Sequence, residues 1–216
     1  MNAVLFSQME PPPEWEEEFN RWYDTEHVPE RLALEGFLWA RRYVAVQAEP
    51  KYAALYALRD LNALRTPGYL RLREQPSPQT VRMLGAARGF TRFEAEEVAR
   101  SARPEAPPPE QVPYLFAVLF SVPSEREEEF SAWYDQEHTP LLLEDPRWLA
   151  VHRYRIRAGT PPQWTHLALH FLAALEAVDS EARRRARSTP WRQRLAAEPW
   201  FKPCYGLYRQ LPAPWE

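Results

Sequence analysis

The chain contains one pattern twice, first at Glu16–Pro29 as EEEFNRWYDTEHVP and again 111 residues later at Glu127–Pro140 as EEEFSAWYDQEHTP. Aligned without gaps, residues 15–43 and 126–154 are identical at 14 of 29 positions. Chance does not produce such agreement within 216 residues, so we infer that one unit has been duplicated and fused. A site that forms between two copies of this unit can therefore form within a single chain.

Length and composition fit two small domains. The duplication favours two units of about 105 residues over one large domain. We expect a first repeat over residues 1–103, a proline-rich linker over residues 104–112 and a second repeat over residues 113–216. The linker region lacks apolar periodicity, so we expect a semi-rigid spacer.

Composition argues against several classes of protein. The longest apolar runs, such as Leu115–Phe120, are far too short to cross a bilayer, and the N-terminus lacks the basic region of a signal peptide. Cys204 is the only cysteine, which excludes an intrachain disulfide and a thiolate cluster for a metal. We expect a cytoplasmic protein, and the net charge of −3 argues against general binding to nucleic acid or to membranes. The 25 Arg against 2 Lys indicate GC-rich coding, and the 23 Pro fit a thermophilic source.

Both halves show the same order of expected elements. In the first half these are a strand at Ala3–Met9, a helix at Glu14–His27, a hairpin of Phe37–Gln47 and Lys51–Leu58, helices near Leu61–Arg73 and Thr80–Ala87, and a strand at Phe90–Val98. In the second half they are Tyr114–Val122, Ser124–His138, Trp148–Ala158 with Trp164–Phe171, Ala173–Arg187, Pro190–Ala197 and Cys204–Leu211. The order βαββαβ is the ferredoxin-like arrangement of the α+β class. One face of such a sheet lies under its helices, and a second copy of the sheet would cover the other.

The first helix of each half should end before a proline. One residue separates each repeated histidine from the proline that follows, Pro29 or Pro140. The residue before a proline is disfavoured in the helical conformation. We therefore expect the two helices to stop at His27 and His138.

The repeated motif also resembles a known superfamily. The pattern Phe-x-x-Trp-Tyr-Asp-x-Glu-His-x-Pro, which leads into Gly36–Tyr43 in the first half, is similar to the dimeric α+β barrel proteins. Its Tyr-x-x-x-His-x-Pro core is most similar to that of EthD-like and muconolactone-methylisomerase-like members. The resemblance implies two tandem ferredoxin-like repeats whose antiparallel sheets pack back to back within one chain. It thus implies a monomer with pseudo-twofold symmetry and leaves a further homodimer open.

The motif helix places ionisable side chains next to an apolar stripe. At 100° per residue, Phe19, Trp22 and Tyr23 share one face, with Glu26 near its middle and His27 at its edge. A carboxylate on that face needs a nearby cation, such as Arg42 or, in the second copy, Arg153. The second copy repeats the arrangement with Phe130, Trp133, Tyr134, Glu137 and His138. The histidines are candidates for general acid/base groups, with helix capping as the alternative, and the aromatic residues are candidates for the core.

Three further histidines are confined to the second half. His152, His166 and His170 correspond to Arg41, Tyr52 and Tyr56 of the first half. His166 and His170 share one face of a strand about 13 Å apart, too far for one metal ion. A two-residue hairpin turn would set Arg41 opposite Tyr56, and therefore His152 opposite His170. This pair is a candidate for proton transfer or metal binding, with simple cross-strand packing as the alternative, and we expect no metal site.

Together these patterns lead to the hypothesis of a small-molecule enzyme. We expect acid–base chemistry on a hydrophobic, aromatic or lactone-like substrate, in a pocket between helix and sheet of the second half, without an organic cofactor. The reaction would be that of an isomerase, a cyclase or a monooxygenase. The expected catalytic residues are His138, His152, His170 and Glu137, and the expected substrate-binding residues are Arg153, Tyr154, His166, Tyr134 and His27.

Three alternatives stay open at this point. The chain could be a non-catalytic module that binds a small ligand or serves as a stable barrel. The resemblance also includes haem-handling proteins, for which a Soret band on haem titration would be the sign. Finally, the basic segment Arg183–Arg194 could grip an anionic ligand or RNA, although a solvated helix face explains it as well.

Overall fold

The computed structural model describes residues 2–216 and confirms the βαββαβ order in both halves. The first half comprises β1 Ala3–Glu10, α1 Glu16–Trp22, α2 Val28–Leu32, β2 Phe37–Gln47, β3 Tyr52–Leu58, α3 Pro67–Glu74, α4 Pro78–Ala86 and β4 Arg88–Ala102. The second half comprises β5 Tyr114–Phe120, α5 Glu127–Trp133, α6 Thr139–Leu142, β6 Trp148–Thr160, β7 His166–Leu172, α7 Glu181–Ser188, α8 Pro190–Ala196 and β8 Cys204–Gln210.

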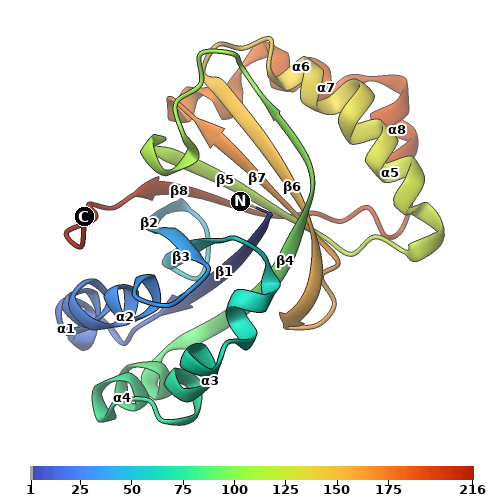
Figure 1. The fold of residues 1–216 in the computed structure, drawn as a ribbon. Helices are drawn as coiled ribbons and strands as arrows, with labels where there is room; N and C mark the ends of the chain where they lie inside the picture. Colours follow the sequence, from blue (N-terminus) through green and yellow to red (C-terminus); the bar gives the residue numbers. More distant parts are fainter. Residues whose placement is uncertain (1) are drawn as a thin grey trace.

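The strands form one closed antiparallel barrel in the order β1-β3-β2-β8-β5-β7-β6-β4. Strand β4 pairs with β6, and β8 pairs with β2, so both junctions between the halves are hydrogen-bonded. A closed barrel leaves no free strand edge. The helices of the first half lie on one side of this barrel and those of the second half on the opposite side (Figure 1). The expected α+β fold, a pair of ferredoxin-like units within one chain, is thus confirmed.

Three apolar layers hold this arrangement together. One fills the barrel, and the other two lie between each sheet and its own helices. In β1, Val4 and Phe6 belong to the barrel interior, whereas Leu5 belongs to the layer under the helices. Strands buried on both faces need unbroken apolar runs, which explains the sequence of β5 and of residues Ala3–Phe6 in β1.

The proline-rich segment between the halves packs against the barrel. Residues Pro109–Gln111 form a 3-10 turn, and Val112 is buried among the side chains of the barrel interior. Arg41 on β2 donates from Nε to the Glu110 carbonyl over 2.6 Å. Within residues 2–216, no helix has the length and apolar character needed to cross a membrane.

The prediction that Pro29 and Pro140 end the motif helices is wrong. In each copy α1 or α5 passes into a π-helical turn, Tyr23–His27 or Tyr134–His138, and the helix then continues as α2 or α6. In the first copy the Val28 N–H bonds to the Tyr23 carbonyl, five residues back. The proline therefore falls in the first turn of a new α segment, where its missing N–H is tolerated. π-Turns of this kind are frequent at functional sites.

The predicted His152–His170 pair is also wrong. The first hairpin closes where the Ala45 N–H bonds to the Lys51 carbonyl, so the loop holds an odd number of residues rather than two. A slip of one residue moves every side chain to the other face. In the second hairpin, which has the same register, His152 therefore lies opposite Leu169, and His170 lies opposite Val151. The two histidines leave the sheet on opposite faces.

Candidate functional site

A cavity of about 340 Å³ lies between the sheet and the helices of the first half. Its walls come from β1, β3, β4, α2, α3 and α4 together with the end of the π-turn, and Thr160 at the end of β6 adds one residue from the second half. The apolar side chains that line it are Leu5, Met9, Leu72, Pro76, Val81, Leu84 and Phe90, and the polar ones are Ser7, His27, Arg31, Tyr56, Tyr69, Arg73, Thr80, Arg92 and Thr160. A hollow that combines apolar walls with convergent polar groups is a common form of small-molecule site.

His27 is the last residue of the π-turn and one wall of this cavity. Its ring packs against Trp22 and Tyr23, with centroid distances of 4.4 and 4.6 Å. Burial, helped by the charges of Arg31 and Arg42, holds the pKa of His27 well below its ordinary value, so the ring is neutral at pH 7. Its Nδ1 is buried and has no hydrogen-bond partner among the described residues. A buried polar atom without a partner is costly, so a group that bonded to it would stabilise the site.

Tyr56 on β3 is the second polar group of this kind. It lies opposite Leu5 of β1, and its buried hydroxyl has no well-formed hydrogen bond to any residue of the described chain. Burial, with a smaller contribution from the neighbouring Tyr23 phenol, holds the pKa of Tyr56 well above its ordinary value. The hydroxyl is therefore a neutral donor at pH 7.

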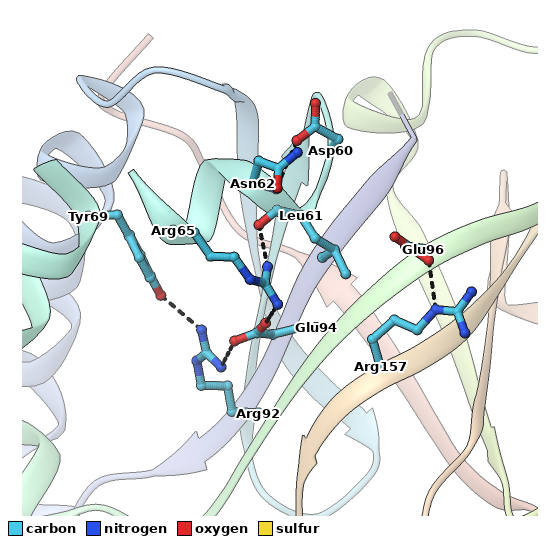
Figure 2. A network of polar contacts seen from close by, with 9 residues as sticks. All are labelled: Asp60, Leu61, Asn62, Arg65, Tyr69, Arg92, Glu94, Glu96 and Arg157. Carbon is cyan, nitrogen blue, oxygen red and sulfur yellow. Dashed lines mark hydrogen bonds and ion pairs between the residues drawn. The ribbon is translucent and has the colours of Figure 1, made fainter. Parts of the chain in front are cut away.

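Two cations of the cavity wall differ in how they are held. Arg31 is 8% exposed, donates from Nη1 to the His27 carbonyl over 2.7 Å, and has no carboxylate within ion-pair distance in the part of the chain that the structure describes. Arg92 already has an anionic partner, because it donates to Glu94 over 2.5 Å and also to the Tyr69 hydroxyl over 3.0 Å; Figure 2 shows both bonds. Arg31 is thus a buried guanidinium that can meet an anionic group in the cavity.

The mouth of the cavity is apolar and exposed. Val81 and Phe90 line the cavity and are 57% and 42% exposed. The exposed Arg73 stands beside them and makes no ion pair with any described carboxylate. A ligand would therefore enter past two apolar side chains and one cation.

The equivalent space in the second half is almost filled, with only about 30 Å³ remaining. The strand registers show which residues correspond: Leu5 pairs with Tyr56 in the first sheet as Phe116 pairs with His170 in the second. By the same register, Phe120 of the second copy stands at the position of Met9 in the first. Larger rings at these positions occupy the volume that the first copy leaves open.

The helices of the second half add to this filling. The Ser77 cap of α4 corresponds to the Thr189 cap of α8, which places Arg192 where the first copy has Thr80. The Arg192 guanidinium lies over the Phe201 ring at 4.4 Å. The expected pocket of the second half is therefore small, and the open cavity lies in the other copy.

Two of the predicted histidines do meet at this small cavity. His138 stacks on Trp133 at 4.4 Å, its Nδ1 lies 3.4 Å from the Ala186 carbonyl, and burial lowers its pKa to about 3. His170 is satisfied on both sides: the Trp148 indole donates to its Nδ1 over 3.2 Å, so its Nε2 carries the proton and faces the Tyr134 hydroxyl at 3.2 Å. Such bonding is that of a core histidine.

The other two histidines lie elsewhere. His152 faces the barrel interior, where it packs on Phe171 and its Nδ1 is 3.4 Å from the Tyr154 hydroxyl. His166 contacts the Phe130 ring and the Thr165 hydroxyl. Burial is the main cause that lowers the pKa of each of these two histidines to about 4. His138, His152 and His170 therefore do not converge on one site.

Glu137 fastens the motif helix to the rest of its half. It accepts from the Thr189 hydroxyl, the N-cap of α8, over 2.6 Å. In the first copy Glu26 accepts from Ser77, the N-cap of α4, and from Thr80. A contact that both copies keep, in the open half and in the filled half, is explained by folding.

Arg153 belongs to a second repeated contact. It pairs with Asp135 at 2.6 Å and lies over the Tyr134 ring at 5.1 Å, as Arg42 pairs with Asp24 and lies over Tyr23. Neighbouring residues of a strand point to opposite faces. Tyr154 is accordingly buried inside the barrel, so these two expected substrate-binding residues point to different faces of the sheet.

Sequence reasoning missed Tyr56, Arg31 and the open volume around them. A signal was present in the two aligned copies, because Leu5 and Met9 stand where the second copy has phenylalanine. Among residues 2–216 no group of three His, Cys, Asp or Glu side chains could hold a metal ion.

Comparison with known proteins supports the fold. No family model and no curated protein matches the chain. Among solved structures, an anthrone oxidase-like protein superimposes with a TM-score of 0.71 at 12% identity, over 97% of this chain and 91% of that chain. A chlorite dismutase of Candidatus Nitrospira defluvii, in complex with cyanide, gives 0.62 at 12% identity, over 98% and 91%. Taken with the closed barrel, these likenesses show that the chain has the dimeric α+β barrel fold, built here from two halves of one polypeptide.

Proposed function

We propose that the first half of the barrel is a small-molecule enzyme site, which binds a hydrophobic aromatic compound with a weakly acidic group and transfers its proton to His27. The observation that carries this proposal is the cavity of about 340 Å³, whose wall holds the neutral His27, with no partner for its Nδ1, beside the buried Tyr56 hydroxyl. The resemblance to EthD-like and isomerase-like proteins agrees with a pocket role for the motif histidine, here in the first copy.

The size of the cavity suggests the substrate class. An engineered cavity of about 150 Å³ holds benzene in another protein. A volume of about 340 Å³ is therefore enough for two or three fused rings. The apolar lining favours the ring system, whereas His27, Tyr56 and Arg31 offer bonds to one oxygen-bearing edge.

The charges of the site suggest the reaction. A buried imidazole with a low pKa is a poor base alone, because its cation is not solvated. It can accept a proton when the product is an anion held beside it, and Arg31 and the Tyr56 hydroxyl can stabilise that anion. The geometry thus supports abstraction of a proton from a phenol, an enol or a carbon next to a ketone.

The likeness to an anthrone oxidase-like protein suggests a first substrate for testing. Anthrone is a tricyclic ketone with an acidic CH₂ group. Loss of one proton gives an enolate that can reduce O₂; the CH₂ carbon becomes a second ketone, one oxygen atom enters the product and the other leaves as water with both hydrogens. This step needs no oxidant other than O₂.

The test compares two equivalent histidines. The purified chain is given anthrone, and O₂ consumption is followed with an electrode. We expect turnover by the natural chain, loss of at least about a hundredfold in His27→Ala, a typical general-base effect, and little change in the matched variant His138→Ala. Equal activity of the two variants would contradict the proposal, and saturable binding of anthrone without O₂ uptake would favour a non-catalytic binding protein.

A further inference from the structure

Three arginines of the second half surround the small cavity that the proposed function leaves unused. Arg183 and Arg187 lie on α7, Arg192 lies on α8, and all three line the cavity together with Tyr205 of β8. The first copy has Tyr69 and Thr80 at the positions of Arg183 and Arg192, as the helix caps show. The second copy has therefore gained two cations at one place.

None of these three guanidinium groups has a carboxylate within ion-pair distance in the described chain, whereas Arg185 of the same helix pairs with Glu144. Arg183 donates from Nη1 to the Val178 carbonyl, and Asp179 acts on it only from beyond ion-pair distance. Each arginine has five N–H donors. Most of the donors around this cavity are thus left for solvent or for a ligand.

The arrangement is costly without an anion. Burial, followed by repulsion from Arg187, lowers the pKa of Arg183 below its ordinary value, and burial is also the main cause that lowers the pKa of Arg192. Arg183 lies over Phe116 at 5.3 Å, and Arg192 lies over Phe201. Such cation–π contacts offset only about 0.5–2 kcal/mol each. Arg183 uses one in-plane donor on the Val178 carbonyl, and Arg192 has a side-chain hydrogen bond with Tyr205. Most in-plane donors of the three side chains stay unused, so packing alone does not explain three convergent arginines.

We propose that Arg183, Arg187 and Arg192 form a binding site for a small tetrahedral oxyanion, either free phosphate or the phosphate end of a phosphomonoester. A single arginine can hold a carboxylate through a bidentate pair, whereas three guanidinium groups match the charge and the several acceptor oxygens of a phosphate dianion. This site goes beyond the proposed function, because it lies in the other half of the barrel.

The space around the arginines limits what can be attached to the phosphate. The remaining cavity of about 30 Å³ is roughly the share of one water molecule in the liquid, so it admits phosphate oxygens and no ring. Tyr205 is 43% exposed beside it, and an organic group would extend over this side chain into solvent. RNA is disfavoured as the ligand because the chain is acidic overall, with a net charge of −3.

The test is calorimetric titration of the full chain with inorganic phosphate, at an ionic strength kept constant with NaCl. We expect one phosphate per chain and at least about tenfold weaker binding in Arg183→Gln and in Arg187→Gln, given the usual strength of hydrogen bonds to charged groups. Arg184→Gln is the matched control, since Arg184 is exposed on the same helix and does not line the cavity. Arg187 is also exposed, so its variant keeps the test informative if the Arg183 variant unfolds.

Further arms separate the sources of the phosphate and the two proposals. Phenyl phosphate that binds tighter than phosphate would indicate a phosphomonoester, and equal affinity would indicate the free ion; both results support the site. No phosphate binding, equal loss in Arg184→Gln, or binding of single-stranded RNA alone would overturn it. His27→Ala should bind phosphate normally, so failure of the first-half site and failure of this one can be told apart.

Discussion

The five histidines make the stability of this protein strongly dependent on pH. Burial is the first cause that holds the pKa of each one below 6.5: to about 3 for His138, to about 4 for His152 and His166, and well below the ordinary value for His27 and His170. In the unfolded chain the same groups take up protons near pH 6.5. Below that pH the unfolded state therefore binds more protons than the folded state, and the free energy of unfolding falls as the pH falls.

The magnitude follows from these shifts. Between pH 7.5 and pH 5.5 each histidine with an unfolded pKa near 6.5 removes about 1.4 kcal/mol of stability, so five together remove about 7 kcal/mol. A domain has about 5–15 kcal/mol in total. We therefore expect the chain to approach unfolding near pH 5, before most of its carboxylates are protonated.

Urea unfolding followed by tryptophan fluorescence, from pH 8 to pH 5, measures this loss directly. In the variant His166→Gln, the change in the free energy of unfolding with pH should be smaller by about one fifth, because one of the five histidines is removed. A loss of less than about 2 kcal/mol between pH 7.5 and pH 5.5 would refute the reasoning, since it would mean that the folded protein accepts these protons.

Three further outcomes follow from the packing. Asp24→Ala removes the partner of a buried guanidinium and should lower the free energy of unfolding by about 2–4 kcal/mol. Asp135→Ala should lower it less, because the Asp135 side chain is 46% exposed whereas that of Asp24 is 26% exposed. Thermal unfolding of both variants checks this order, and the reverse order would contradict it. Leu5→Phe combined with Met9→Phe copies the second half into the first and should abolish binding of anthrone while the circular dichroism spectrum stays unchanged; retained binding would place the ligand elsewhere. Glu26→Gln weakens one helix-to-cap contact and should lower the free energy of unfolding by about 1 kcal/mol, measured by urea titration, and no loss would show that the contact is unimportant.

The fold could be predicted from the sequence because the duplicated motif recurs with its flanking strands. The apolar run Leu115–Phe120 and the helix face of Phe19, Trp22 and Tyr23 are local patterns. Such patterns can be recognised from the sequence without knowledge of the tertiary structure. The continuation of the helix past Pro29 could not be predicted in the same way. It depends on a π-turn that re-phases the backbone, and no residue type in Tyr23–His27 requires that turn.

The site was harder to predict because it depends on register and on volume. One residue more or less in a hairpin loop decides whether His152 and His170 meet or face apart. The excess of histidines drew attention to the second half, yet burial there serves packing, as the two bonds of His170 show. The open cavity arises because some side chains are smaller in the first copy than at the equivalent positions of the second. Alignment of the strands reveals this difference, for example Leu5 where the second copy has Phe116.

The most direct test of the account is a crystal structure of the chain soaked with 4-iodophenol, in which the anomalous signal of iodine locates the ligand. We predict one strong peak between the first-half sheet and its helices, within contact distance of His27 and Tyr56. A peak beside His138 and His170 instead, or within the barrel, would contradict the claim that the first copy holds the working site and the second copy is filled.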